Sequence, residues 1–256
     1  MDSTQYVGKR MLIFGMHVHV GIKSTELRID IMNQMRYFMP HILALSTSSP
    51  FWQGNPTGFK SFRSIIFEDL PRTGIPETFS SYKDYQSYVK TLIKSNTIDE
   101  PTKIWWDIRP HSIYPTLEFR ICDCCTRMMD ALSIAALIQA LVAKLIILRN
   151  SNQSWRNYRG SLIHENKWRA TKDGINSKLV DLGKSKEVAY KKLMLEMLDF
   201  VDEVVDDLGS RKYINHINKI LTSGSSADKQ LQIFKDTKNI KDVVDHLILE
   251  TAKDIA

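Results

Sequence analysis

Two histidines stand one residue apart in GMHVHVGI, residues 15–22. The alternation with valine predicts a β-strand, in which His17 and His19 project from the same face. Imidazoles commonly ligate metal ions, but a pair of this kind is also common as an ordinary surface or structural feature. A zinc site would need more ligands, and the sequence has no H-E-x-x-H motif. The pair alone leaves both interpretations open.

Charged and apolar residues alternate in TLEFRICD, residues 116–123, which predicts a strand with Glu118 and Arg120 on its polar face. These two side chains could simply form an ion pair. Alternatively, the carboxylate could bind a divalent cation beside a guanidinium that binds phosphate or carboxylate. The stretch WWDIRPH places Asp107 and Arg109 on one face of a second strand, which Pro110 ends.

Other familiar chemistry is missing from the sequence. No glycine loop of the P-loop or dinucleotide-binding type occurs, so a nucleotide would have to be held by a metal ion and arginines on a sheet. All three cysteines fall in CDCC, residues 122–125. We interpret them as small buried residues or free thiols, because no second ligand cluster accompanies them.

Composition indicates an ordinary globular chain. The 256 residues are 43% hydrophobic and 25% charged, with a net charge of +6 from 35 basic and 29 acidic residues. Because the basic residues are dispersed, we expect small anionic substrates and no nucleic-acid partner. The first ten residues lack the apolar core of a signal peptide, and the free cysteines suit a reducing compartment, so we expect a cytoplasmic protein.

The elements that would position these residues form an α+β pattern. We expect strands over residues 10–22, 103–111 and 116–123, and a helix after Ser24 or Thr25 that Pro40 kinks or divides. Residues 46–76 read as a long functional loop, and residues 81–95 as a helix. The second half is expected to be mainly helical, with a helix over residues 186–208 and two more in the tail.

One apolar stretch, residues 131–148, approaches the length of a membrane span. It contains Gln139 and Lys144, so we expect a buried helix and no membrane association.

Four segments gain meaning from their order along the chain: GMHVHVGI, LALSTSSPFWQGNPTGFKSFRS, WWDIRPHSIYPTLEFRICD and ENKWRATKDG. From about residue 15 to about residue 183, the sequence closely resembles the carboxylate–amine ligase family, also called the glutamate–cysteine ligase type 2 family. The resemblance implies a single domain over residues 1–256, with a glutamine synthetase-like antiparallel sheet flanked by helices. It also implies ATP and Mg²⁺ or Mn²⁺ as cofactors.

The implied reaction joins glutamate to an amine, with cysteine as the expected acceptor. ATP phosphorylates a carboxylate, and the amine displaces phosphate from the acyl phosphate to give γ-glutamylcysteine, ADP and phosphate. By the same resemblance His17 and Glu118 would ligate the metal, and Arg109 and Arg120 would be catalytic, phosphate-facing groups. Nucleotide- or substrate-binding roles fall to His19, Arg63, Arg72, Asn166, Trp168 and Arg169.

Two departures from the family pattern affect these expectations. Lys172 stands where the family has arginine, which keeps the charge but loses the fork geometry. The family's glutamate-rich strand, with a G-x-E-E-E-like motif, is absent from these residues. We therefore expect an N-terminally truncated catalytic domain with an exposed edge strand, and either a homo-oligomer or a separate N-terminal partner chain. The alternative function is an impaired remnant, or a subunit of a split ligase, that keeps nucleotide or amino-acid binding.

Overall fold

A computed structural model of the chain describes residues 5–253. The helices, including three short 3₁₀ helices labelled η, are α1 (Gln5–Lys9), α2 (Thr25–Met35), η1 (Arg36–Phe38), α3 (Met39–Ser46), α4 (Phe62–Glu68), α5 (Tyr82–Lys94), η2 (Pro101–Lys103), α6 (Met128–Asn150), α7 (Gly160–Asp173), η3 (Gly174–Asn176), α8 (Tyr190–Val205), α9 (Arg211–Ser223), α10 (Ser226–Thr237) and α11 (Ile240–Ala252). The strands are β1 (Val18–Gly21), β2 (Phe51–Trp52), β3 (Asn55–Pro56), β4 (Thr73–Gly74), β5 (Trp105–Trp106), β6 (Ile108–Pro110), β7 (Thr116–Phe119), β8 (Lys178–Asp181) and β9 (Lys186–Ala189).

A three-stranded antiparallel sheet in the order β1–β7–β6 carries the polar residues of interest. Its register sets His19 opposite Glu118, and Glu118 opposite Arg109 on the other side of β7. These three residues therefore form a row across one face of the sheet. The predicted strand pairing of residues 103–111 with 116–123 is confirmed.

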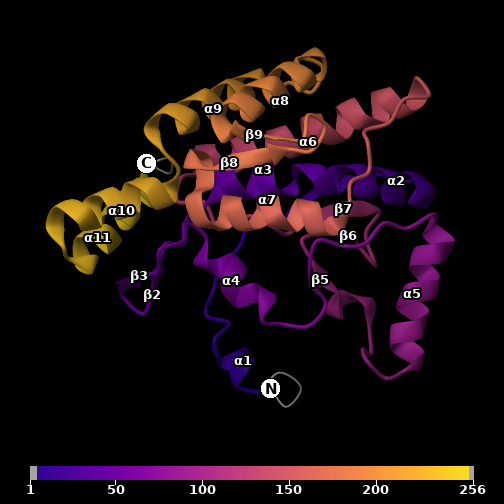
Figure 1. The fold of residues 1–256 in the computed structure, drawn as a ribbon, viewed down its shortest axis with the longest axis horizontal. Coiled ribbons are helices and arrows are strands. Elements are labelled where there is room, and N and C mark those ends of the chain that lie inside the picture. Colours follow the sequence, from indigo (N-terminus) through magenta and orange to yellow (C-terminus); the bar gives the residue numbers. More distant parts are fainter. Residues whose placement is uncertain (1–4, 254–256) are drawn as a thin grey trace.

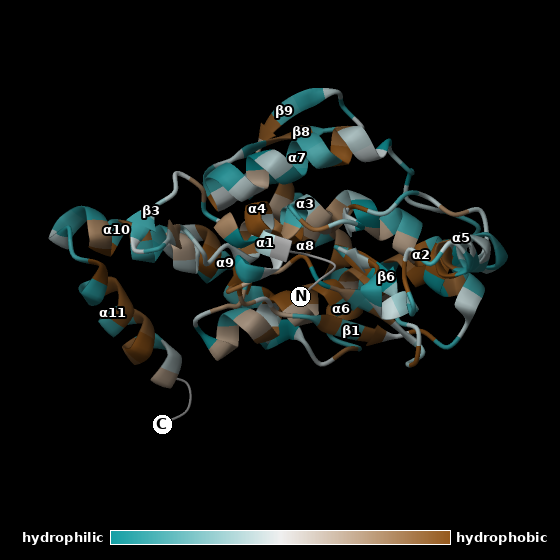
Figure 2. Cartoon of the chain, turned by 90° about the horizontal axis from the view of Figure 1, so that it is seen from below, coloured by the Kyte–Doolittle hydropathy of each residue, from teal (hydrophilic) through white to brown (hydrophobic). Residues whose placement is uncertain are grey.

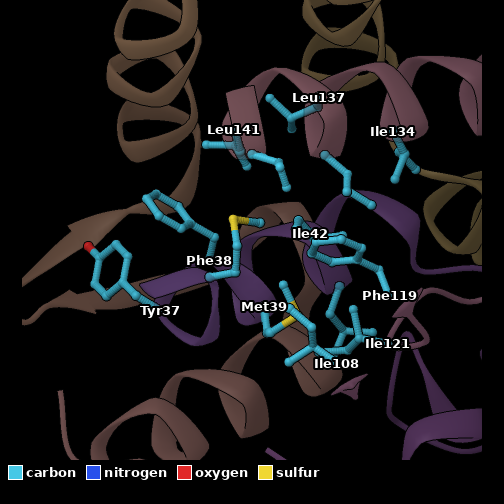
Figure 3. Packing of buried hydrophobic residues seen from close by; sticks show 14 of the residues in the cluster. Tyr37, Phe38, Met39, Ile42, Ile108, Phe119, Ile121, Ile134, Leu137 and Leu141 are labelled. Carbon is cyan, nitrogen blue, oxygen red and sulfur yellow. The ribbon is translucent and has the colours of Figure 1, made fainter. Parts of the chain in front are cut away.

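The opposite face of the sheet is apolar and rests on the helical core. Phe119 and Ile108 are fully buried and point toward Met39 and Ile42 of α3, while Leu137 of α6 lies on the far side of that helix (Figure 3). Helix α3 lies between α6 and α7, and α10 with α11 forms a hairpin at one end of the molecule (Figure 1). Burial of this continuous apolar cluster holds the sheet against the helices.

The helix predicted after residue 24 is interrupted as expected. The Ser24 hydroxyl accepts a hydrogen bond from the backbone N–H of Leu27 and so caps α2. A 3₁₀ turn over Arg36–Phe38 then separates α2 from α3, and Pro40 lies in the first turn of α3. Proline is tolerated there because the first helical N–H groups need no partner within the helix.

Helix α6 is long and apolar enough to cross a membrane, and half of its most apolar 18-residue window is buried within the chain. It contacts β1, and Figure 2 shows both as neighbouring hydrophobic segments. Lys144 of α6 is largely buried, and its ammonium lies 2.6 Å from a carboxylate oxygen of Glu203 on α8. The predicted buried helix is therefore confirmed.

Three sequence predictions are wrong in detail. Residues 186–189 form β9, which pairs with β8, so α8 begins at Tyr190. The prediction began the helix too early, because the apolar spacing of the helix extends back to Val188. Residues 46–76 are not a plain loop, because they contain α4, capped by the Ser61 hydroxyl. The strand expected over residues 10–22 is limited to β1 and one isolated bridge between Gly15 and Asp123.

Leu137→Ala should lower the free energy of unfolding by about 2–5 kcal/mol, because Leu137 is fully buried and its truncation leaves a cavity in the apolar core. Ile147→Ala on the same helix is the control, since Ile147 is 43% exposed. Its effect should stay within about 0.5 kcal/mol. Urea unfolding followed by tryptophan fluorescence measures both, and equal effects would contradict the assignment of α6 to the core.

Candidate active site

Glu118 is the centre of a charged cluster on the polar face of the sheet. It is only 3% exposed, and each carboxylate oxygen has its own guanidinium. Arg109 Nε donates to Oε2 at 2.6 Å, and Arg120 Nη1 donates to Oε1 at 2.9 Å. Charge-assisted hydrogen bonds of this kind compensate the cost of burying the carboxylate.

The two arginines differ in which of their guanidinium donors are already hydrogen-bonded within the protein. Arg109 Nη1 also donates to the backbone carbonyls of Thr102 and Ile104, at 2.7 and 2.5 Å. In contrast, Arg120 Nε is buried without a hydrogen-bond partner among the described residues. Arg109 therefore mainly fixes Glu118, whereas Arg120 retains one buried donor without a partner.

Both histidines lie at the open side of this cluster. His17 Nδ1 is 3.2 Å and His19 Nε2 is 3.7 Å from the same Glu118 oxygen, and both side chains are more than one third exposed. The other nitrogen of His19 lies 3.0 Å from the hydroxyl of Thr116, which fixes the orientation of the ring. The structure thus brings together four predicted site residues around Glu118.

Electrostatics in the cluster favour a charged carboxylate and a neutral imidazole. Burial opposes ionisation of Glu118, but hydrogen bonds from His17 and Arg109 and the charge of Arg120 outweigh it and hold its pKa well below the ordinary value. Burial lowers the pKa of His19, as do His111, His17 and Arg109, against the opposing effect of Glu118. A neutral imidazole keeps a lone pair available to a ligand.

These donors fit part of a metal shell but do not complete one. Ligands about 2.1 Å from an octahedral ion lie roughly 3 Å apart. The 3.2 Å between His17 and Glu118 is close to this value, and the 3.7 Å between His19 and Glu118 is longer. Within residues 5–253, no group of three or more His, Cys, Asp or Glu side chains is arranged to hold a metal ion. His17 and Glu118 could therefore supply two ligands, with nucleotide phosphates and other groups supplying the rest.

A second charged cluster lies beside strands β6 and β7, and the sequence analysis did not predict it. Lys167 of α7 is buried, with its ammonium 2.5 Å from Asp107 and 2.7 Å from Glu68. Burial would lower the pKa of Lys167, but the two carboxylates raise it overall. The Asp107 carbonyl in turn accepts the backbone N–H of Arg120 at 2.7 Å. Lys167 lies inside the ENKWRATKDG segment, yet only its neighbours were predicted as site residues.

Arg63 braces the end of β7. Its guanidinium donates to the carbonyls of Arg120 and Ile121 at 3.0 and 3.2 Å. It also passes so close to Gly15 that a Cβ there would lie 2.5 Å from Arg63 Nε. Any larger residue at position 15 would therefore have to displace the Arg63 guanidinium from this position.

A cavity of about 370 Å³ opens beside Arg63, with Trp52, Phe62 and Ser49 among the residues that line it. Asp123 also lines it and accepts hydrogen bonds from the hydroxyls of Ser49 and Ser61, both at 2.8 Å. Burial raises the pKa of Asp123, against the effect of Arg63. This cavity adjoins the Glu118 cluster through Arg63, and it is large enough for a small substrate.

The other predicted site residues make their contacts elsewhere. Arg72 stacks on Trp105, and its Nε donates to the Lys103 carbonyl. The Asn166 amide bonds both backbone groups of Val180, and Arg169 pairs with Glu165 and Glu187. Trp168 is 47% exposed and contacts Phe59 edge-on. Asn166 and Arg169 thus fasten α7 to the β8–β9 hairpin, and their predicted ligand roles stay predictions.

A comparison with solved structures shows which class of protein shares this fold. Over 90% of this chain, the fold matches the crystal structure of the glutamate–cysteine ligase from Francisella tularensis in complex with AMP, with a TM-score of 0.61. The match covers 58% of that chain, and 14% of aligned residues are identical. The fold is therefore that of a glutamate–cysteine ligase, which confirms the predicted α+β class.

Sequence comparison gives the family. Residues 1–246 match the model of glutamate–cysteine ligase family 2. Proteins named "Putative glutamate--cysteine ligase 2" from Roseiflexus castenholzii and Herpetosiphon aurantiacus are 52% and 50% identical over 255 residues, 100% of this chain. The chain belongs to this family, as the sequence resemblance indicated. It spans 67% and 66% of the length of these two relatives.

Glu118→Gln should destabilise the protein by about 3–5 kcal/mol at pH 7, because two buried guanidinium groups lose their counter-charge. A carboxylate whose pKa is lowered by folding contributes stability above its unfolded pKa of about 4.3 and loses it as the pH falls toward the folded value. The difference between wild type and variant should therefore shrink below about pH 4.3.

Urea unfolding between pH 7 and pH 3 measures this difference. Glu165→Gln is the control, because Glu165 is exposed and its ion pair with Arg169 lies on the helix surface. Its effect should stay within about 0.5 kcal/mol. A Glu118→Gln penalty that did not change with pH would contradict the ion-pair assignment.

Proposed function

We propose that this chain carries the phosphate-facing part of an ATP-dependent ligase that joins glutamate to cysteine. The observation that carries the proposal is the Glu118 cluster, a buried carboxylate held by Arg109 and Arg120 below two accessible histidines. Family membership supports the ligase class. The AMP bound to the ligase of similar fold is consistent with nucleotide binding here.

The cluster suits the charge problem of this reaction. Carboxylate phosphorylation brings two anions together, so fixed positive charge must stabilise the transition state. The charge of the Arg120 guanidinium would stabilise a phosphoryl oxygen, while Glu118 and Arg63 hold its guanidinium and backbone in place. A Mg²⁺ or Mn²⁺ ion near His17 and Glu118 would add charge neutralisation when bound. We assign the cavity beside Arg63 to the amino-acid substrates.

Arg120→Gln should lower the rate of ADP formation by about 10²–10³-fold, the usual cost of losing one donor to a developing anion. The assay supplies glutamate, cysteine, ATP and Mg²⁺, and it measures both ADP and γ-glutamylcysteine. Arg211→Gln is the control, because Arg211 bridges Asp202 and Asp206 at an exposed turn. The control should retain wild-type activity.

Equal losses in both variants, or ADP released without γ-glutamylcysteine, would contradict the proposal. ATP binding with neither product formed would favour the alternative, a remnant or subunit that keeps only ligand binding.

We also propose that a second copy of this chain pairs with β1. Within the described residues β1 pairs only with β7, so its outer edge has free backbone groups beside a groove lined by Leu132 and Tyr213. Light scattering should give a dimer mass, and Leu132→Glu should reduce it toward the monomer. A monomer at all concentrations would contradict this assembly.

A further inference from the structure

A second cavity of about 270 Å³ lies among elements that the proposed ligase site does not use. Its walls come from η1, the segment after α6, the β8–β9 turn and α8. Figure 3 shows Tyr37 at the margin of the core, with its hydroxyl pointing away from the other labelled side chains. The cavity therefore opens at the edge of the helical core.

Aromatic rings form one wall of this cavity. The ring of Trp155 lies 5.5 Å from that of Tyr37, 5.0 Å from that of Phe38 and 5.1 Å from that of Phe200. The faces of such rings attract cations. Lys144 already illustrates this, because its ammonium lies 5.4 Å from the centre of the Phe200 ring while it pairs with Glu203.

The carboxylates of Asp181 and Glu196 also line the cavity. Asp181 is buried, and its Oδ1 accepts the backbone N–H groups of Gly183 and Lys184, both at 3.0 Å. This fixes the carboxylate and leaves Oδ2 for a cation. Glu196, on α8, supplies the second carboxylate.

The ammonium of Lys184 sits between these two carboxylates. It lies 3.2 Å from Asp181 Oδ2 and 3.3 Å from Glu196 Oε2. The lysine side chain is 53% exposed, so it can swing into solvent at small cost. The position of the Lys184 ammonium shows that such a group fits between the two carboxylates, in a cavity that aromatic rings also line.

We propose that this cavity binds a small primary amine with an aromatic body, whose ammonium replaces that of Lys184 between Asp181 and Glu196. The body of the ligand lies against Tyr37, Trp155 and Phe200. Once Lys184 moves into solvent, the two carboxylates leave the site negatively charged, so it favours a cation. The aromatic rings favour an apolar, aromatic body on that ligand. The site is separate from the Glu118 cluster and does not depend on the proposed ligase activity.

Isothermal titration with phenethylamine tests the proposal, with phenylacetate as an anionic ligand carrying the same ring. Phenethylamine should bind saturably with one site, and phenylacetate should not bind. Lys184→Met removes the competing ammonium, so it should tighten amine binding by about 3- to 10-fold, whereas Glu196→Gln should weaken it by a similar factor. Lys191→Met, on the exposed surface of α8, should leave the affinity unchanged.

Circular dichroism of each variant confirms that the fold is retained. Equal affinity for phenethylamine and phenylacetate, no saturable binding of the amine, or a Lys184→Met variant that binds the amine no more tightly than wild type would each overturn the proposal. The gain in affinity is the decisive readout, because loss of a purely structural lysine would not produce it.

Discussion

The buried carboxylate of Glu118 is the constraint on which the rest of the site depends. A carboxylate that is 3% exposed is tolerable only with compensating charge, and Arg109 and Arg120 supply it from two adjacent strands. The antiparallel register β1–β7–β6 places these groups in one row, and the apolar residues on the other face fix that register. The same alternation that packs Phe119 into the core therefore aims Glu118 at the histidines.

Helices far away in sequence secure this arrangement. Lys167 of α7, which also pairs with Glu68 of α4, holds the Asp107 carboxylate, and the Asp107 backbone carbonyl accepts the backbone N–H of Arg120. Arg63 binds the carbonyls at the end of β7. These contacts hold the Arg120 guanidinium in a fixed position beside Glu118, and preorganised stabilisation of a developing anion requires such a fixed positive charge.

Sequence alone predicted what is local and periodic. The two-residue alternation around His17, His19, Glu118 and Arg120 gave the correct shared face, and the helical spacing gave α2, α5, α6 and the tail helices. It missed Lys167, because nothing in a helical pattern distinguishes a buried lysine with two distant carboxylates from a solvated one. Asn166 and Arg169 make contacts with the β8–β9 hairpin, which the sequence did not predict, and their ligand roles remain predictions.

Proton NMR of the histidine rings during titration with Mn²⁺–ATP tests the central claim most directly, because a bound paramagnetic ion broadens nearby resonances. The His17 and His19 signals should broaden, and the His111 signal with them, because the His111 ring lies 5.3 Å from that of His19. The account predicts no broadening of His246, which lies on α11 at the far end of the molecule (Figure 1). Broadening that spared His17 and His19, or that affected His246 as strongly as these two, would contradict the account.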